Sequence, residues 1–432
     1  MRYNALNNTE KRDYMLINIV NYIIAVLFFV CYSYQFFYLI VPFLKRKRHS
    51  AEVKLHRFAV LISARNEEAV IGNLIESIRR QTYPSDKITI FVCADNCTDR
   101  TADVAEDAGA IVFERFDTRR VGKGYALDFL LKSIGRCFKP DAFDGFFVFD
   151  ADNVLEPDYI ERMNETFCEG FNIVTGYRNS KNYGDNWISA GYSLWFLRES
   201  QYLNRSRYLL GTSAAVSGTG FMFSRNVIER LGGWKYFLLT EDIEFTIDSV
   251  TAGEKIGYCE KAMLYDEQPT NFKQSVRQRL RWARGYIQVF CGYGKQLIKG
   301  VFSKNFFSCY DMTMACMPAM VLSLASAVVN IATLLLNIQD PAICEQVIGS
   351  LMQSVLNIYL TFLVIGGVAL ITEWKRIHAP AGKKLLYLLT FPLFMFTYIP
   401  ISVAALFVNV EWKPIVHQRN RSLSEIKGTA NK

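Results

Sequence analysis

Two aspartates one residue apart follow an apolar segment near the middle of the chain. The segment is Phe146–Phe149, and Asp150 and Asp152 come after it. Two carboxylates this close repel each other unless a cation or strong hydrogen-bond donors lie between them. Carboxylate oxygens suit Mg²⁺ or Mn²⁺, and these ions typically also hold a diphosphate. The pair therefore predicts a metal and diphosphate site, although an isolated Asp-x-Asp is also typical of a solvated turn after an edge strand.

Other polar groups also follow apolar runs or begin helical patterns. Residues 63–68 read Ser-Ala-Arg-Asn-Glu-Glu and open a helix, while Asp95 ends a second apolar run. Thr98 or Asp99 can then cap the next helix, because both side chains accept hydrogen bonds from free N–H groups. Lys123 lies in a Gly-Lys-Gly turn that begins a further helix but lacks the spacing of a Walker loop, which disfavours an ATPase.

An acidic pair begins a later helix. Glu241 and Asp242 follow Thr240, which is a plausible N-cap for a helix running to about Ala252. The positive end of that helix would favour the two carboxylates. Two acids in a first helical turn are also ordinary capping, so this pair alone does not establish a site.

A long helix beginning near Asn271 carries a mixed polar and aromatic face. Gln278, Arg281 and Trp282 fall on that face by the i, i+3, i+4 rule. Arginine can bind phosphate with two donors at once, and an indole can stack on a flat or sugar-like surface. The alternative is a basic face resting on lipid headgroups.

Strand-like and helix-like patterns alternate between about residues 52 and 304. The strand-like runs are Phe58–Ser63, Ile88–Ala94, Ala110–Phe113 and Phe146–Phe149, and the helical patterns are Glu67–Arg80, Asp99–Ala108, Lys123–Ile134 and Pro157–Cys168. This alternation predicts a mostly parallel sheet with helices on both faces. Ligands bind at the carboxyl ends of the strands in such sheets, so the polar groups that follow the strands should meet there.

The composition indicates membrane helices together with a water-soluble domain. Hydrophobic residues make up 51% of the 432 residues, which excludes a disordered chain, and the mean hydropathy of +0.09 lies between a soluble enzyme and an all-membrane protein. The uncharged stretches long enough to cross a bilayer are Leu16–Leu44, Met312–Gln339, Gln346–Thr372 and Leu385–Val410. The first is too long for a signal-peptide core and lacks an Ala-x-Ala site, so we expect a retained anchor.

Basic residues predict the orientation of the chain in the membrane. Residues 45–48 read Lys-Arg-Lys-Arg directly after the first span, which places the following domain in the cytoplasm. We expect an anchor at residues 1–51, a cytoplasmic domain at 52–304, and an interfacial helix, membrane helices and tail at 305–432. Four full spans would put the tail outside, whereas its basic residues favour the inside. A re-entrant hairpin broken at Pro392 and Pro400 is the other alternative.

These motifs in this order resemble the processive, membrane-integrated branch of glycosyltransferase family 2. The resemblance rests on Asp95, Asp150-Ala151-Asp152, Thr240-Glu241-Asp242 and Gln278-x-x-Arg281-Trp282, and it extends from Phe58 to Tyr286 and the flanking spans. That branch includes cellulose, chitin-oligosaccharide, hyaluronan and poly-N-acetylglucosamine synthases. It implies an α/β fold of the GT-A (Rossmann-like) type in the cytoplasm, flanked by transmembrane α-helices in the plasma membrane.

The resemblance also implies a role for each matching residue. Binding of the nucleotide sugar is implied for Ser63, Asn66, Glu67, Asp95, Lys123 and Asp150, binding of Mg²⁺ or Mn²⁺ for Asp150 and Asp152, and binding of acceptor and diphosphate for Gln278, Arg281 and Trp282. Asp242 is then the general base that takes a proton from the acceptor hydroxyl. A single displacement would invert an α-linked donor to a β-linked product.

The implied activity is synthesis of a β-linked polysaccharide from a UDP-sugar at the cytoplasmic membrane face. UDP-N-acetylglucosamine is the first candidate donor and UDP-glucose the second, by their frequency in the family. Residues 217–220 (Ser-Gly-Thr-Gly) depart from some members and leave the sugar open. The expected partners are the donor, a growing glycan or lipid acceptor and the bilayer, with no nucleic acid. Single addition to a lipid or short acceptor is the alternative. A non-enzymatic membrane scaffold is disfavoured by the intact carboxylates.

Histidine and cysteine contribute no recognisable site. His49, His56, His378 and His417 fall outside every motif, and the ten cysteines do not show the spacing of a zinc site. We therefore expect no zinc-based catalysis.

Overall fold

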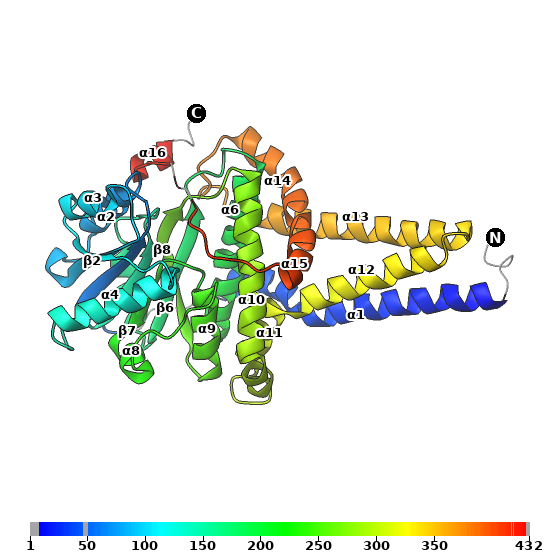
Figure 1. Cartoon of the computed structure of the whole chain (residues 1–432), viewed down its shortest axis with the longest axis horizontal. Helices are drawn as coiled ribbons and strands as arrows, with labels where there is room; N and C mark the ends of the chain where they lie inside the picture. Colours follow the sequence, from blue (N-terminus) through cyan, green and yellow to red (C-terminus); the bar gives the residue numbers. More distant parts are fainter. Residues whose placement is uncertain (1–7, 46–50, 416, 418, 429–432) are drawn as a thin grey trace.

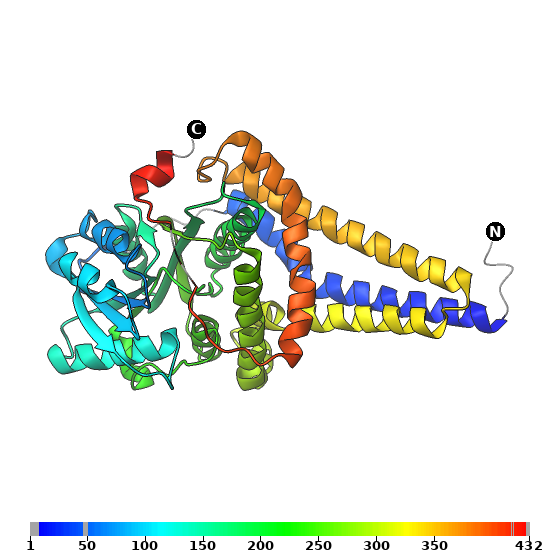
Figure 2. The ribbon, with the colours of Figure 1, turned by 45° about the horizontal axis from the view of Figure 1, so that its top comes forward.

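The molecule consists of an α/β domain and a bundle of long helices that projects from it (Figure 1). The structure is a computed structural model that describes residues 8–45, 51–415, 417 and 419–428. Arg46, Lys47 and Arg48 of the predicted basic flank lie outside the described residues. The bundle contains α1 (Asn8–Leu44), α12 (Pro318–Leu336) and α13 (Pro341–Thr372). These helices run away from the α/β domain in both views (Figures 1 and 2).

In the described part of the chain, eight strands form one mixed sheet in the order β3-β2-β1-β4-β7-β6-β8-β5. Their bounds are β1 Phe58–Ala64, β2 Ile88–Asp95, β3 Ile111–Arg115, β4 Gly145–Asp150, β5 Val154–Leu155, β6 Ile173–Ser180, β7 Phe221–Ser224 and β8 Ile256–Asp266. The pairs β1–β2, β1–β4 and β2–β3 are parallel, as predicted. Strands β6 and β8, which the sequence patterns did not predict, also pair in parallel. Strand β7 runs antiparallel to both of its neighbours, and β5 runs antiparallel to β8.

Helices cover both faces of the sheet because successive side chains of a strand point to opposite faces. Ala59 and Leu61 of β1 pack in one core, which includes α4 (Lys123–Cys137) and α6 (Trp187–Arg198). Phe58 and Val60 pack in the other core, which includes α2 (Ile71–Arg79), α3 (Thr101–Asp107) and α5 (Tyr159–Phe167). The remaining helices of this domain are α7 Arg205–Leu210, α8 Arg225–Leu231, α9 Glu241–Thr251 and α10 Phe272–Val301, with shorter helical turns at Ser85–Lys87 and Glu199–Asn204.

Three helical segments are long and apolar enough to cross a membrane, among the residues that the structure describes. They are Asn18–Leu44, Ile343–Thr372 and Ala381–Phe407, and they correspond to the first, third and fourth predicted spans. The second predicted span is broken. Its helices, Phe306–Cys316 (α11) and Val321–Leu336 within α12, meet at an angle of 42° and could form a fourth span together.

The last apolar segment lies beside the α/β domain and not within the projecting bundle. It comprises α14 (Ala381–Phe396) and α15 (Tyr398–Phe407), which run alongside α10 (Figure 1). Arg279 of α10 donates to the carbonyl of Phe394 (3.3 Å) and to the hydroxyl of Thr397. At its start, Lys383 donates to the carbonyl of Gly184 (2.7 Å). The chain beyond its end also contacts the domain, where Arg419 N–H donates to Glu267 Oε2 (2.9 Å). Residues Ala381–Phe407 nevertheless form one apolar helical segment and not the hairpin broken at Pro392 and Pro400.

A buried ion pair fixes α1 and α11 to the α/β domain. Arg207 binds Asp311 with two hydrogen bonds of 2.7 and 2.9 Å. The hydroxyls of Tyr34 and Tyr38 each donate to the same carboxylate at 2.8 Å. Arg207 and Asp311 are almost inaccessible to solvent, at 3% and 1% exposure. All four side chains therefore have hydrogen-bond partners at a buried position, where an unpaired charge would be costly.

Asp311→Ala should lower the free energy of unfolding by about 3–5 kcal/mol, because it leaves the Arg207 guanidinium buried without its counterion. Denaturant unfolding of the full chain in detergent measures this loss. Asp103→Ala is the matched control, since the pair that Asp103 forms with Arg100 is exposed, and we expect a change within about 0.5 kcal/mol. Equal effects of the two substitutions would contradict the anchoring role of Asp311.

Candidate active site

Nearly all residues predicted for the site line one cavity of about 830 Å³ at the carboxyl ends of β1, β2 and β4. The predicted residues in its lining are Ser63, Glu67, Asp95, Lys123, Asp150, Asp152, Asp242, Gln278, Arg281 and Trp282. Asn66 is not part of the lining. Its side-chain oxygen accepts a hydrogen bond from the backbone N–H of Thr98 (2.8 Å), so Asn66 shapes the loop after β1.

Asp95 lies at the end of β2 and is held by an arginine that the sequence motifs did not reveal. Arg115, at the end of the neighbouring strand β3, donates to Asp95 Oδ1 at 2.6 Å. Asn96 donates to the same oxygen (2.8 Å). Burial raises the pKa of Asp95, although Arg115 opposes that effect. One carboxylate oxygen is therefore fixed by protein donors, and the side chain lines the cavity in a set orientation.

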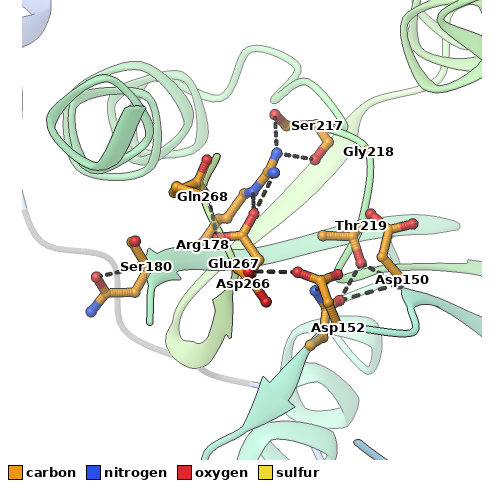
Figure 3. Close-up of polar contacts among 12 residues, drawn as sticks. Asp150, Asp152, Arg178, Ser180, Ser217, Gly218, Thr219, Asp266, Glu267 and Gln268 are labelled. Atoms are coloured by element: carbon orange, nitrogen blue, oxygen red, sulfur yellow. Dashed lines mark hydrogen bonds and ion pairs between the residues drawn. The ribbon is translucent and has the colours of Figure 1, made fainter. Parts of the chain in front are cut away.

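Asp150 and Lys123 form a pair at the end of β4. Lys123 Nζ donates to Asp150 Oδ1 and to the carbonyl oxygen of Gly218 (2.7 Å). The backbone N–H of Asp150 donates to Thr219 Oγ1 at 2.9 Å (Figure 3). About 37% of the Asp150 side chain is exposed toward the cavity, compared with 12% for Lys123. Asp150 is therefore the accessible member of the Asp-x-Asp pair.

Asp152 is buried and lies against the end of β8. Its Oδ2 accepts a hydrogen bond from the backbone N–H of Glu267 at 2.7 Å (Figure 3). Burial alone would raise the pKa of Asp152. His417, Lys181 and that N–H outweigh burial and hold the pKa below its usual range. The carboxylate is thus kept ionised, which is the form that binds metal ions.

A glycine-containing loop, residues 217–220, contacts both Asp150 and the first turn of α9. Gly218 and Gly220 have φ angles of 74° and 65°, which favour glycine. A Cβ on Gly220 would lie 1.9 Å from the side chain of Leu264, so a larger residue does not fit there. Arg178 donates to the carbonyl of Ser217 (3.1 Å) and to Asp266 Oδ2 (2.6 Å), and this buried pair orders the loop (Figure 3).

Asp242 lies in the first turn of α9 and accepts a hydrogen bond from the backbone N–H of Gly218 (2.6 Å). Burial raises the pKa of Asp242 and of its neighbour Glu241, and the positive charges of Lys123 and Arg281 oppose this rise.

Thr240 occupies the N-cap position, but its hydroxyl makes no capping bond, which corrects the expected cap. A Cβ on Gly285 of α10 would lie 2.5 Å from that hydroxyl, so Thr240 instead packs against α10.

Gln278, Arg281 and Trp282 of α10 line the cavity. Gln278 Oε1 is buried and accepts no hydrogen bond. Arg281 forms no ion pair within the described residues, although its charge acts on Asp242. Trp282 packs edge-on against Tyr192 and Phe196 at centroid distances of 5.7 and 6.1 Å. These contacts place Trp282 in the cavity wall and not on the outer surface of α10, and the Gln278 and Arg281 side chains remain free for a ligand.

The C-terminal segment after α15 closes one side of the cavity. We call residues 408–428, of which 416 and 418 are not described, the C-terminal strap. Trp412, Lys413 and Ile415 line the cavity, and the Arg65 guanidinium lies 5.6 Å from the Trp412 ring. His417 Nδ1 lies 2.9 Å from Glu67 Oε1. The histidine judged to be outside every motif is therefore brought to the site.

The strap is held by several contacts beyond the cavity. Arg419 N–H donates to Glu267 Oε2 (2.9 Å), and Arg421 donates to the carbonyl of Lys181 (3.2 Å). Helix α16 (Leu423–Gly428) then docks through Ile426, which is fully buried.

Burial lowers the pKa of His417, but Asp152 and Glu67 outweigh it and raise that pKa to about 10. A protonated His417 therefore compensates acidic charge at the end of β4.

The acidic groups at this edge of the sheet fit a divalent cation. Burial raises the pKa of Glu67, and the charges of Asp152 and Asp150 add to that effect. Within the described residues, however, no three acidic, histidine or cysteine side chains are already grouped to hold an ion. A cation here would need further oxygen ligands from a diphosphate and water, as Mg²⁺ commonly uses. The donor chemistry therefore fits Mg²⁺ or Mn²⁺ together with a phosphorylated substrate.

Comparison with known proteins gives one family. Residues 56–285 match the family described as "Glycosyltransferase like family 2". The chain is 29% identical over 259 residues to a probable glycosyltransferase, YdaM, of Bacillus subtilis, and this match covers 57% of the chain and 59% of YdaM. It is 25% identical to the beta-monoglucosyldiacylglycerol synthase of Synechocystis, over 56% of the chain and 50% of that enzyme.

A relative with a different product is similarly distant. Identity to the poly-beta-1,6-N-acetyl-D-glucosamine synthase of Staphylococcus epidermidis is 23%, over 56% of the chain and 57% of that protein. The matches thus span about half to three-fifths of the curated relatives. Among solved structures, a mannosyltransferase from Pyrobaculum calidifontis in complex with GDP-Man and Mn²⁺ aligns with a TM-score of 0.56 and 15% identity, covering 90% of this chain and 99% of that one. This likeness shows the fold.

His417→Ala should loosen the strap near the cavity, because it removes the partner of Glu67. We expect faster amide hydrogen exchange over residues 411–417 and a several-fold weaker binding of UDP to the full chain. Lys427→Ala is the control, since its bond to Glu156 lies far along the strap and is exposed. The control should change exchange only near α16. Unchanged exchange and UDP affinity in His417→Ala would contradict this role of the strap.

Proposed function

We propose, from the premise that the chain belongs to glycosyltransferase family 2, that it transfers a sugar from a UDP-sugar to an acceptor hydroxyl with inversion at the sugar carbon. The observation that carries this proposal is the shared cavity. Asp152 at the end of β4, Asp242 at the start of α9 and Arg281 on α10 all line it. A diphosphate site and a candidate base therefore open to the same space.

The donor is proposed to bind across the carboxyl ends of β1, β2 and β4. Asp95 would accept from the uridine, in an orientation that Arg115 fixes. Ser63 and Glu67 line the same side of the cavity, and the Trp412 ring of the strap covers it. UDP-N-acetylglucosamine and UDP-glucose are the two candidate donors. The named products of the relatives, poly-N-acetylglucosamine and a glucosyl lipid, support both sugars.

The diphosphate is proposed to lie between the Asp-x-Asp pair and α10. Asp150 and Asp152 would hold Mg²⁺ or Mn²⁺, and that ion supplies electrostatic stabilisation to the departing UDP. Arg281 would donate to the phosphate oxygens from the opposite wall, where it forms no ion pair within the described residues. Negative charge that develops on the leaving group is stabilised most strongly by fixed donors in a site that excludes water.

Asp242 is proposed as the general base. Its carboxylate takes the proton of the acceptor hydroxyl as that oxygen bonds to the sugar carbon and the bond to the UDP oxygen breaks. The N–H of Gly218 and the start of α9 orient the carboxylate. Burial raises its pKa, which brings a carboxylate closer to the range in which a base is efficient. One displacement from the opposite face gives a β-linked product from an α-linked donor.

The α/β domain is proposed to face the cytoplasm of a plasma-membrane protein. Helices α1, α12 and α13 would cross the bilayer, and they carry many exposed apolar side chains, including Phe29, Leu336 and Ile371. Helices α14 and α15 would lie at the membrane surface beside α10. The strap then stays on the side of the α/β domain, and its basic residues follow the positive-inside rule together with Lys375 and Lys383.

Two acceptors remain compatible with this chemistry. The motif Gln278-x-x-Arg281-Trp282 favours a growing β-linked glycan, because it resembles that of processive synthases. Single addition to a lipid is the second candidate, and the apolar part of the cavity favours it.

Incubation of the purified full chain with radiolabelled UDP-N-acetylglucosamine or UDP-glucose and Mn²⁺ tests the proposal that both candidates share. Transfer of label to any acceptor supports it, and failure to bind or use either donor contradicts it.

Asp152→Asn should abolish turnover and weaken metal-dependent UDP binding by at least tenfold, because it removes a charged metal ligand. Calorimetric titration with UDP, with and without Mn²⁺, measures the effect. The variant should retain the weak metal-independent binding. Normal activity with normal Mn²⁺ dependence would show that Asp152 holds no metal.

Asp242→Asn should keep UDP binding within about twofold and lose transfer by about 10²–10⁴-fold, since a general base contributes on that order. Asp248→Asn is the matched control on the same helix. Its carboxylate binds Tyr236 and Lys235 away from the cavity, so transfer should change little. Transfer by Asp242→Asn within a few-fold of the parent would assign the base to another group.

A further inference from the structure

The cavity continues from the proposed active site into the helical bundle. Beyond Arg281 and Trp282 its walls come from α1, α12, α13 and α15. Side chains on these walls are mainly apolar, and they include Phe36, Leu39, Leu324, Ile358, Phe362 and Ile399. The same space therefore has a charged end at the sheet and an apolar end among helices proposed to lie in the membrane.

The apolar end stops within the bundle. On α1 the lining begins at Phe28, about 24 Å along the helix from its end at Leu44, taking 1.5 Å per residue. On α13 it begins at Ile358, whereas that helix starts at Pro341. The cavity thus occupies the half of the bundle next to the α/β domain.

Hydrogen bonds close the far half of the bundle. Asn21 of α1 and Asn330 of α12 donate to each other at 3.1 and 3.0 Å. Gln346 of α13 donates to Asn18 of α1 at 2.9 Å. These amide contacts join the three helices beyond the cavity, and the residues that line the cavity on α1, α12 and α13 end before them.

The chemistry of this pocket suits a hydrocarbon chain. Sugar hydroxyls buried against apolar walls without hydrogen-bond partners are costly, so a glycan is a poor occupant. Hydrocarbon instead gains free energy when it leaves water, and it can leave the bilayer at little cost.

We infer that the acceptor is a lipid with a free hydroxyl, whose hydrocarbon lies in the apolar end of this cavity and whose hydroxyl reaches Asp242. This inference rests on the proposed function and names its acceptor class. The hydroxyl loses its proton to Asp242, its oxygen bonds to the sugar carbon, and UDP leaves with the electrons of the broken bond. A hydroxyl needs such a base, whereas a phosphate oxygen is already ionised, so the base favours an alcohol over a lipid phosphate.

The test uses the full chain in phosphatidylcholine vesicles with labelled UDP-N-acetylglucosamine or UDP-glucose and Mn²⁺. Vesicles carry dioleoylglycerol, a long-chain polyisoprenol, or neither. We expect label in the organic phase only when a hydroxyl lipid is present. UDP binding, measured separately, reports on the proposed donor site. Loss of UDP binding would sink the proposed function itself.

Leu324→Trp fills the apolar end and provides the matched variant. We expect at least a tenfold loss of labelled lipid, with UDP affinity within about twofold of the parent. Leu335→Trp on the same helix is the control, because Leu335 is 67% exposed and outside the cavity. It should label lipid at the rate of the parent.

Two results overturn the lipid inference while UDP binding persists. One is a water-soluble labelled polymer formed equally well without a hydroxyl lipid. The other is the absence of labelled lipid with both alcohols. The number of sugars on each lipid then separates single addition from polymer growth on a lipid primer.

Discussion

Acidic charge gathered at one edge of the sheet is the constraint on which the rest of this structure depends. Parallel strands β1, β2 and β4 end at the same edge, and their following residues bring Glu67, Asp95, Asp150 and Asp152 to one cavity. Their repulsion is offset by cations from other parts of the chain. These cations are Arg115, Lys123, Arg178, Lys181 and His417. Among these cations, Arg115, Lys123 and Arg178 are fixed by hydrogen bonds to carboxylates, and His417 lies against Glu67.

Helix α10 links that charged edge to the candidate membrane helices. It presents Gln278 and Arg281 to the cavity, and its other side contacts α14 and α15 through Arg279 and Arg284. Arg207 and Asp311 tie α1 and α11 to the same domain. The polar end and the apolar end of the cavity therefore lie between elements that these contacts connect.

Local patterns were enough to predict the strands β1, β2 and β4 and the polar residues that follow them. Apolar runs mark those strands, and the carboxyl-end rule then groups Asp95 with Asp150. His417 could not be found in that way, because it lies 350 residues from its partner Glu67 and in no periodic element. The missing cap bond of Thr240 has a similar cause, since its hydroxyl faces Gly285 of a distant helix. Hydropathy likewise marked α14 and α15 as a span without revealing that both ends return to the α/β domain.

The most direct measurement is an experimental structure of the full chain with UDP, Mn²⁺ and dioleoylglycerol in a lipid nanodisc. We expect Mn²⁺ bound by Asp150, Asp152 and the diphosphate, with Arg281 on the opposite side of the phosphates. We also expect acyl chains between Phe36, Leu324 and Phe362, with the glycerol hydroxyl directed to Asp242. A nucleotide bound away from the Asp-x-Asp pair, or lipid found only on the outer surface of the bundle, would contradict it.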